Sequence, residues 1–427
     1  MAQEKKNYLL PIIVMILLFG MISFVTGLGG PFADVLQKQF NVPNWQSQLG
    51  TFCNFLAYLF MGVPSGIMLK KIGYKKTALV AIVVGFIGVG IQYLSGQAGS
   101  FGIYLLGAFV AGFSMCMLNA VVNPMLNTMG GGGNKGNTLI QVGGSFNSLN
   151  ATIVPVLVGY LAGSTATIES ASPALFIAMG IFAFAFVILW LVNIPEPALD
   201  AEVKSAEKDK YSALSFRHFV LGAIGIFLYV GVEVGIPNFL ILLNTKGLGI
   251  DGTTAGSIAG TYWFLMLIGR LIGAAVGMKV SSKSQLTFTS ALALVFVLLA
   301  IFLPQTITIS MPVFLKSIAF GTATVPLNVL LLVLCGLCTS IMWGGIFNLA
   351  VEGLGKYTKM ASGIFMMLVV GGGVLPLIQG WVADLGGTES FASYINSYWV
   401  IIAGLAYLLF YALAGSKNVN TDIPVEE

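Results

Sequence analysis

One carboxylate, Glu233, stands in the middle of an apolar stretch, and its chemistry needs an explanation. The flanking residues from Phe227 to Leu240 are otherwise uncharged. A charged side chain at the centre of a bilayer costs on the order of a few kcal/mol, so a lone acid in such a stretch marks a functional site by default. Burial favours the neutral form of a carboxylate, so Glu233 is expected to exchange a proton, or to bind sodium when it is ionised. The alternative is a buried polar group that serves packing alone.

Amide side chains recur at helical spacing in two other apolar stretches. Asn119 and Asn123 are four residues apart, directly before Pro124, and therefore share one helix face. Gln141 and Asn147 belong to two adjacent polar stripes of the next stretch. Amides offer both hydrogen-bond donors and acceptors, which suits a neutral ligand with many hydroxyl groups. Hydrogen bonding between neighbouring helices is the alternative use of the same side chains.

Two residues of a later stretch, Trp343 and Asn348, complete the set of expected ligand contacts. An indole ring can pack on the apolar face of a sugar ring, and a further amide adds hydrogen-bonding capacity. Most aromatic residues of so apolar a chain must face lipid or pack against one another, so Trp343 is a weaker indication of a binding site than the amide side chains are.

The composition identifies a lipid bilayer as the solvent of these stretches. Of the 427 residues, 57% are hydrophobic and only 8% are charged. A spanning segment needs about 20 mostly apolar residues, and it must be helical because lipid offers no partners to backbone polar groups. We expect twelve spans, namely Tyr8–Gly29, Leu49–Leu69, Thr77–Leu94, Gly102–Pro124, Leu139–Leu161, Leu175–Val192, Val220–Leu242, Ala255–Met278, Phe288–Leu303, Val325–Leu349, Ala361–Ala383 and Tyr398–Ala414.

Lysine and arginine residues indicate the orientation of this bundle. All of them except Lys38, Lys246, Lys316 and Arg270 fall in the terminal segments and in the loops on the same side. The positive-inside rule therefore places both termini in the cytoplasm, as expected for a multi-pass protein of the cytoplasmic (inner) membrane. The basic residues form no patch, so no nucleic-acid partner is expected.

An internal repeat divides the chain into two halves. The segment Val154–Ala162 matches Leu375–Ala383, and a weaker match with a shorter offset predicts an insertion at the long loop Pro304–Pro326. Two parallel six-helix halves are typical of a transporter that rocks around a site near the middle of the membrane. The expected parts are an N-terminal half (residues 1–194), a cytoplasmic linker (195–217), a C-terminal half (218–416) and a cytoplasmic tail (417–427).

Other function classes find little support in the residues. The predicted spans contain no His–Asp–Ser group and no metal-ligating cluster, and no loop is long enough for a soluble domain. A membrane-embedded enzyme or sensor is therefore the least favoured hypothesis, and neither a cofactor nor a metal is expected.

Four motifs resemble one known family. They are GIMLKKIGYKK after the second span, LNAVVNP at Leu118–Pro124, SFNSLNA at Ser145–Ala151 and GGGVLPLIQGWVADLGG at Gly371–Gly387. Over nearly its whole length the chain resembles the fucose:proton symporter family of the major facilitator superfamily. This resemblance implies an all-α membrane protein with twelve helices in two pseudo-symmetric halves. It also implies uptake of a neutral monosaccharide of the L-fucose, glucose or galactose class by alternating access, usually coupled to an ion.

The same resemblance assigns roles to particular positions. The substrate-contacting Asn of the fifth span corresponds to Asn147, and a polar or acidic position of the seventh span corresponds to Glu233. Proton-linked members carry acids where this chain has Asn119 and Gly30, and Asp34 lies one helical turn after Gly30. Coupling to H⁺ or Na⁺ is therefore expected to run through Glu233 or Asp34, and an uncoupled sugar facilitator remains the alternative.

Arg270 is the one arginine inside a predicted span. It is a plausible counter-charge for Glu233, but the repeat places its backbone near the cytoplasmic end of the eighth span. A structural or gating role together with Asp384 or Glu352 is the favoured expectation.

Overall fold

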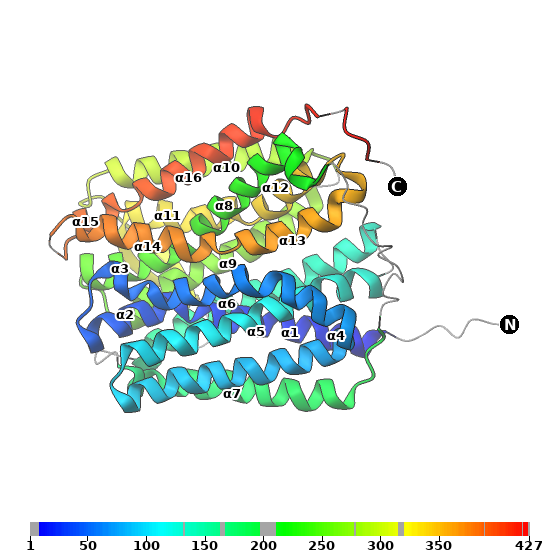
Figure 1. The fold of residues 1–427 in the computed structure, drawn as a ribbon. Coiled ribbons are helices and arrows are strands. Elements are labelled where there is room, and N and C mark those ends of the chain that lie inside the picture. The colour runs from blue at the N-terminus through cyan, green and yellow to red at the C-terminus, as the bar shows by residue number, and fades with distance from the viewer. Residues whose placement is uncertain are drawn as a thin grey trace.

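Long helices that run roughly along one axis make up the structure, a computed structural model (Figure 1). It describes residues 8–130, 133–162, 167–196, 211–276, 279–314, 320–387, 389–420 and 422–425. The first half contains α1 (Leu9–Gly27), α2 (Gly29–Phe40), α3 (Asn44–Ser47), α4 (Leu49–Ala98), α5 (Phe101–Met129), α6 (Gly133–Ala162) and α7 (Ile168–Leu191). Residues 197–210 of the expected linker lie outside the described part of the chain.

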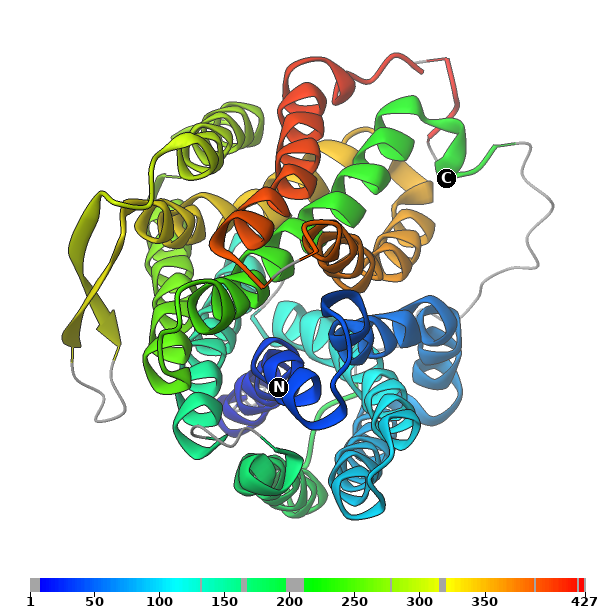
Figure 2. The same ribbon diagram turned by 90° about the vertical axis from the view of Figure 1, so that its left-hand side faces the viewer.

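The second half begins with a short 3-10 helix, η1 (Ala213–Ser215), directly before α8. Its further elements are α8 (Arg217–Leu242), η2 (Leu243–Gly247), α9 (Gly252–Val276), α10 (Ser282–Phe302), β1 (Thr308–Phe314), β2 (Phe320–Pro326), α11 (Leu327–Thr339), α12 (Met342–Val351), η3 (Gly355–Tyr357), α13 (Thr358–Leu368), α14 (Gly371–Asp384), α15 (Phe391–Asn396), α16 (Trp399–Phe410) and η4 (Tyr411–Gly415). Figure 2 shows the helices of the first half, blue to teal, beside those of the second half, green to red.

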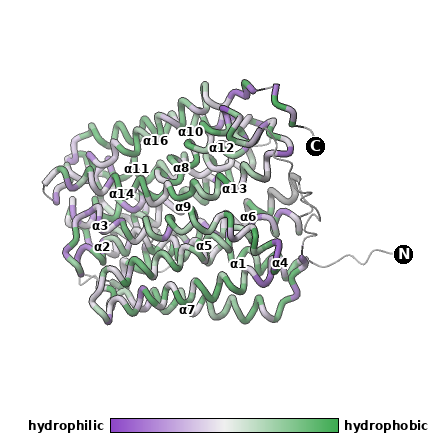
Figure 3. The backbone as a smooth tube through the Cα atoms, viewed as in Figure 1, coloured by the Kyte–Doolittle hydropathy of each residue, from purple (hydrophilic) through white to green (hydrophobic). Residues whose placement is uncertain are grey.

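The prediction of twelve membrane crossings is confirmed. Eleven of the described helical runs are long and apolar enough to span a membrane, and α4 contains two spans in its 50 residues. The break lies at Gly73, whose φ of 83° and ψ of 173° interrupt the helix. A Cβ atom there would lie 2.9 Å from the Glu196 carboxylate, so the turn requires glycine. Hydrophobic residues follow the helices along their length, and hydrophilic ones gather towards both ends (Figure 3).

The insertion predicted at Pro304–Pro326 is a β-hairpin rather than an irregular loop. Strands β1 and β2 pair antiparallel, with Met311 opposite Ala323. Met311 and Val325 are buried, on the face that packs against α9 and α11, whereas Ser310 and Thr324 on the other face are exposed. Two strands alone are marginal in stability, so the hairpin depends on its packing against α9 and α11. Figure 2 shows it at the side of the bundle.

The two halves pack closely at the end of the bundle that holds α2, α3 and α15, which we call the distal end. The opposite, proximal end is where α1 begins and α16 ends (Figure 1). At the distal end a Cβ atom on Gly256 of α9 would lie 2.2 Å from the carbonyl oxygen of Pro155 on α6. A Cβ atom on Gly380 of α14 would lie 2.7 Å from the Cα atom of Trp45 on α3. The backbones of the two halves therefore touch there, which glycine alone permits.

Candidate functional site

The partly buried acid Glu233 lies on α8 and forms an ion pair with Arg270 of α9. Oε1 of Glu233 is 3.6 Å from Nη2 of Arg270, and their side chains are 15% and 18% exposed, respectively. Nη1 of Arg270 also donates a hydrogen bond of 2.6 Å to the carbonyl oxygen of Gly144 on α6. The guanidinium group thus connects an acid of the second half to the backbone of the first half.

This pairing corrects the expectation that Arg270 acts with Asp384 or Glu352. Side chains of a helix lean towards its N-terminus, and α9 runs from the distal end to the proximal end (Figure 1). The long side chain of Arg270 therefore reaches back from a proximal backbone position to Glu233. Glu352 is exposed at the end of α12, where its backbone carbonyl accepts a hydrogen bond of 2.9 Å from Nε2 of His218.

Asp384 lies at the distal end and holds the two halves together. Its Oδ1 accepts hydrogen bonds from the backbone nitrogen of Asn44 at 3.0 Å and from Nδ2 of the same residue at 2.7 Å. Its Oδ2 accepts one from the backbone nitrogen of Trp45 at 2.9 Å. The carboxylate of α14 thus binds the N-terminal amides of α3, which is a favourable place for a negative charge.

Aromatic side chains surround the helix turn that carries Glu233. The hydroxyl of Tyr262 donates to the backbone carbonyl of Glu233 at 3.2 Å and lies 3.0 Å from Oγ1 of Thr339. The hydroxyl of Tyr229, one turn earlier on α8, donates to the carbonyl of Thr339 at 3.0 Å. The ring of Trp343 meets that of Tyr229 edge-on, with centroids 6.3 Å apart. The structure thus brings the predicted Trp343 beside the turn of Glu233, and it adds Thr339, which no sequence pattern singled out.

Asn147 lies on the α6 face that meets Arg270. It follows Gly144, the acceptor of the Arg270 bond, by three residues, a spacing that places both on one side of a helix. Nδ2 of Asn147 donates to the carbonyl oxygen of Phe19 on α1 at 3.0 Å. The side chain is partly exposed.

The two amides of α5 form a second polar group. Nδ2 of Asn119 donates to the hydroxyl of Tyr58 on α4 at 3.0 Å and to the carbonyl oxygen of Met115 at 3.1 Å. Nδ2 of Asn123 donates to the carbonyl oxygen of Asn119 at 3.2 Å. Both asparagines are partly exposed.

Of the two remaining predicted contacts, only Asn348 has a described side chain, and it does not join these groups. The side chain of Gln141 lies outside the described part of the chain. Asn348 is exposed, and its Nδ2 lies 3.4 Å from the hydroxyl of Ser282 at the start of α10. Its position is that of a residue at the proximal surface.

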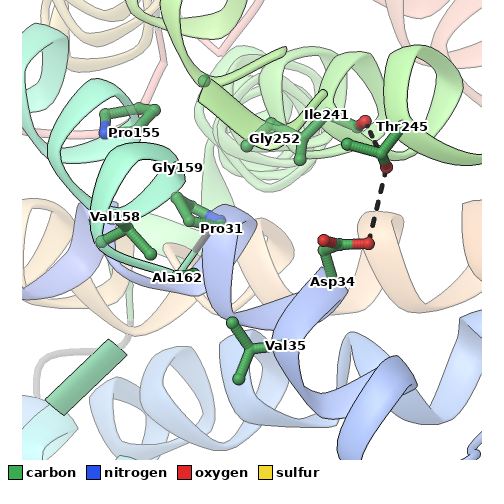
Figure 4. A pocket seen from close by; sticks show the side chains of 11 residues that line it. Pro31, Asp34, Val35, Pro155, Val158, Gly159, Ala162, Ile241, Thr245 and Gly252 are labelled. Carbon is green, nitrogen blue, oxygen red and sulfur yellow. Dashed lines mark hydrogen bonds between the residues drawn. The ribbon is translucent and has the colours of Figure 1, made fainter. Parts of the chain in front are cut away.

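Asp34, the second predicted ion-coupling residue, lines a small cavity at the distal end. The cavity measures about 20 Å³ and lies between α2, α6, α8 and α9. Asp34 is 6% exposed, and Nζ of Lys38 lies 2.9 Å from its Oδ2. Its Oδ1 accepts a hydrogen bond of 3.5 Å from Thr245 of η2, as Figure 4 shows. The charge of Asp34 is therefore compensated by a lysine of its own helix.

Comparisons with known proteins give consistent results. The profile of the Major Facilitator Superfamily matches residues 14–367. The chain is 30% identical to a glucose/galactose transporter of Brucella abortus, over 98% of this chain and 97% of that protein. It is 23% identical to the L-fucose-proton symporter of Escherichia coli, over 92% and 91% of the two chains.

Solved structures share the fold. A fucose transporter in its outward conformation superimposes with a TM-score of 0.66 at 20% identity, and the match covers 96% of this chain and all of that one. A D-xylose-proton symporter superimposes with a TM-score of 0.72 at 11% identity, over 96% and 99% of the two chains.

Proposed function

Because this chain belongs to the major facilitator superfamily, we propose that it takes up a neutral monosaccharide by alternating access, coupled to H⁺ or Na⁺. Its full-length relatives are named sugar transporters, so the chain is a sugar transporter and not an enzyme. The substrate belongs to the glucose, galactose or L-fucose class that those names describe.

The charges of the candidate site support a neutral ligand. Glu233 and Arg270 compensate each other at 3.6 Å, and the other predicted contacts with described side chains are amides and an indole. A charged substrate would need an uncompensated opposite charge, since burying a charge without a partner is costly. Amides match the donors and acceptors of sugar hydroxyls instead.

Arg270 contacts both Glu233 of the second half and the Gly144 carbonyl of the first half. This observation carries the assignment of coupling to Glu233. The ion-pair partner of Asp34 is Lys38 of the same helix, so the charge of Asp34 stays compensated when the halves rock and its 3.5 Å hydrogen bond from Thr245 of the second half changes. The partner of Glu233 is held by the Gly144 carbonyl of the opposite half. The environment of Glu233 therefore depends on the relative position of the halves, as a residue that couples ion binding to rocking requires.

In the membrane we place both termini in the cytoplasm, so the distal end faces outward and is closed in this conformation. The protein resides in the cytoplasmic membrane, with the bilayer, the sugar and the coupling ion as its partners. The decisive test is uptake of labelled glucose, galactose and L-fucose into proteoliposomes, with the sodium and proton gradients varied independently. Uptake of no monosaccharide would contradict the proposal, and uptake that only equilibrates would favour the uncoupled facilitator.

Gating is assigned to Asp384 and Arg270, which both connect the halves. The contacts of Glu352 lie within the second half and give no support to a gating role. Opening of the distal end requires that Asp384 release its three donors on Asn44 and Trp45. Hydrogen bonds to a charged group are worth about 1.5–3 kcal/mol each, so Asp384 stabilises the closed distal end.

Asp384→Asn is expected to increase the population of the open distal end by about tenfold or more, because an amide offers one acceptor oxygen and opposes the donors of α3 with its own N–H groups. The measurement is the rate at which an impermeant maleimide labels Ser47→Cys, a buried position of α3, in a background without native cysteines. Asp251→Asn is the matched control, because Asp251 accepts from Thr254 within its own half. Equal labelling rates in Asp384→Asn and its parent would refute the role of Asp384 in keeping the distal end closed.

A further inference from the structure

We propose that the hydroxyl of Tyr58 is a specificity-determining contact of the sugar site. Tyr58 donates a hydrogen bond to one hydroxyl of the sugar, and Asn119 accepts a hydrogen bond from the same hydroxyl. This inference rests on the proposed function, since it needs a transported sugar, but it concerns a residue that neither the sequence pattern nor the coupling site requires.

The orientation of the Asn119 amide follows from its partners. Its Nδ2 bonds the carbonyl oxygen of Met115 at 3.1 Å, and a carbonyl oxygen can only accept, so the atom in that place must be the N–H₂ group. The second hydrogen of the same group goes to the Tyr58 hydroxyl at 3.0 Å. Both amide hydrogens are thus used within the protein, and Asn119 can offer a ligand only its acceptor, Oδ1.

The Tyr58 hydroxyl has the complementary capacity. Its oxygen accepts from Asn119, and it donates no hydrogen bond to the residues that the structure describes. Tyr58 is only 2% exposed. A buried hydroxyl that leaves its hydrogen unused loses free energy relative to water, so the site favours a ligand that brings an acceptor to it.

The surroundings of Tyr58 place it on the face that meets the opposite half. Its ring stacks on that of Phe55, with centroids 5.9 Å apart. Phe55 in turn touches α14, because a Cβ atom on Gly372 would lie 2.9 Å from its ring. A ligand held by Tyr58 and Asn119 would therefore lie next to the contact between α4 and α14, the surfaces that separate and rejoin during rocking.

A sugar hydroxyl satisfies both groups together. Its hydrogen points to Oδ1 of Asn119 and its oxygen accepts from Tyr58, which closes a ring of hydrogen bonds with the Asn119–Tyr58 bond as the third side. A deoxy analogue leaves both groups unpaired. A deoxyfluoro analogue cannot donate a hydrogen bond at this position, so it too leaves Oδ1 of Asn119 unpaired. Sites built to bond a hydroxyl reject analogues that lack it.

The experiment measures competition by monodeoxy and monodeoxyfluoro analogues against uptake of the sugar that wild-type protein transports best. At one ring position both analogues are expected to compete at least about tenfold more weakly than the parent sugar. In Tyr58→Phe the apparent affinity for the parent sugar should fall by about three- to tenfold, as loss of one hydrogen bond implies. The deoxy analogue at that position should compete equally well in wild-type and Tyr58→Phe protein. The ratio of affinities between the parent sugar and the deoxy analogue is therefore expected to be smaller in the variant.

Tyr104→Phe is the matched control. Tyr104 is also a buried tyrosine, 3% exposed, and its ring stacks on Phe32 in the first half. The Tyr104→Phe protein should keep the wild-type pattern of competition by the deoxy and deoxyfluoro analogues. A Tyr58→Phe protein that keeps the wild-type pattern with every analogue would overturn the inference while the sugar-transport proposal stands.

A second measurement covers the case in which Tyr58→Phe does not fold. The analogue series on wild-type protein alone must then show one position at which fluorine substitutes for hydroxyl no better than hydrogen does. Deoxyfluoro analogues that compete like the parent sugar at every position would overturn the inference. Failure of wild-type protein to take up any monosaccharide would overturn both the inference and the proposed function.

Discussion

Glu233→Gln is expected to abolish uphill accumulation of sugar, so that the internal concentration no longer exceeds the external one. Downhill exchange should stay within about tenfold of the wild-type rate, because glutamine preserves the shape of the side chain and keeps one acceptor oxygen for Arg270. The reason is that an amide neither exchanges a proton nor binds sodium as a charged ligand. The measurement is accumulation in proteoliposomes under an imposed proton or sodium gradient.

The ion pair makes a second variant necessary. Glu233→Gln leaves Arg270 without its carboxylate at 3.6 Å, and breaking a buried pair by removing one partner costs about 3–5 kcal/mol. The double variant Glu233→Gln with Arg270→Gln removes the unpaired charge. It should fold and exchange sugar without accumulating it. Accumulation by either variant that matches wild type would remove Glu233 from the coupling mechanism and leave Asp34 as the remaining candidate.

Gly256→Leu is expected to reduce uptake by at least about tenfold while the protein remains folded in the membrane. A Cβ atom at this position would lie 2.2 Å from the carbonyl oxygen of Pro155, closer than any relaxed contact, and the obstacle is backbone rather than a flexible side chain. Helices α6 and α9 must then separate at the distal end, and overpacking of this kind costs about 1–3 kcal/mol or more. The halves can no longer close there, so the cycle stops.

The control for this variant is Gly180→Leu on α7, where an added Cβ atom meets nothing within 4 Å. It should transport like wild type. Size-exclusion profiles and binding of labelled sugar to the purified proteins separate a blocked cycle from misfolding. Gly256→Leu protein that cycles at the wild-type rate would mean that the tight distal contact is not part of the transport cycle.

Composition and periodicity determine much of this protein by themselves. The twelve spans follow from the length of the apolar stretches, because lipid leaves helices as the only way to satisfy the backbone. The isolated acid Glu233 and the asparagines at helical spacing mark candidate site residues, because polar groups in apolar helices are expensive. The hairpin at 308–326 could not be predicted in the same way, because its buried face depends on α9 and α11.

Only the tertiary structure decided which of these polar residues act together. The internal repeat places the backbone of Arg270 near the cytoplasmic end of its span, but the lean of its side chain brings it to Glu233 and to the Gly144 carbonyl. Asp384 meets α3 across the two halves, and Asn119 meets Tyr58 across two helices. Such pairs join positions far apart in the chain, and their geometry is set by how helices pack, which no local pattern encodes.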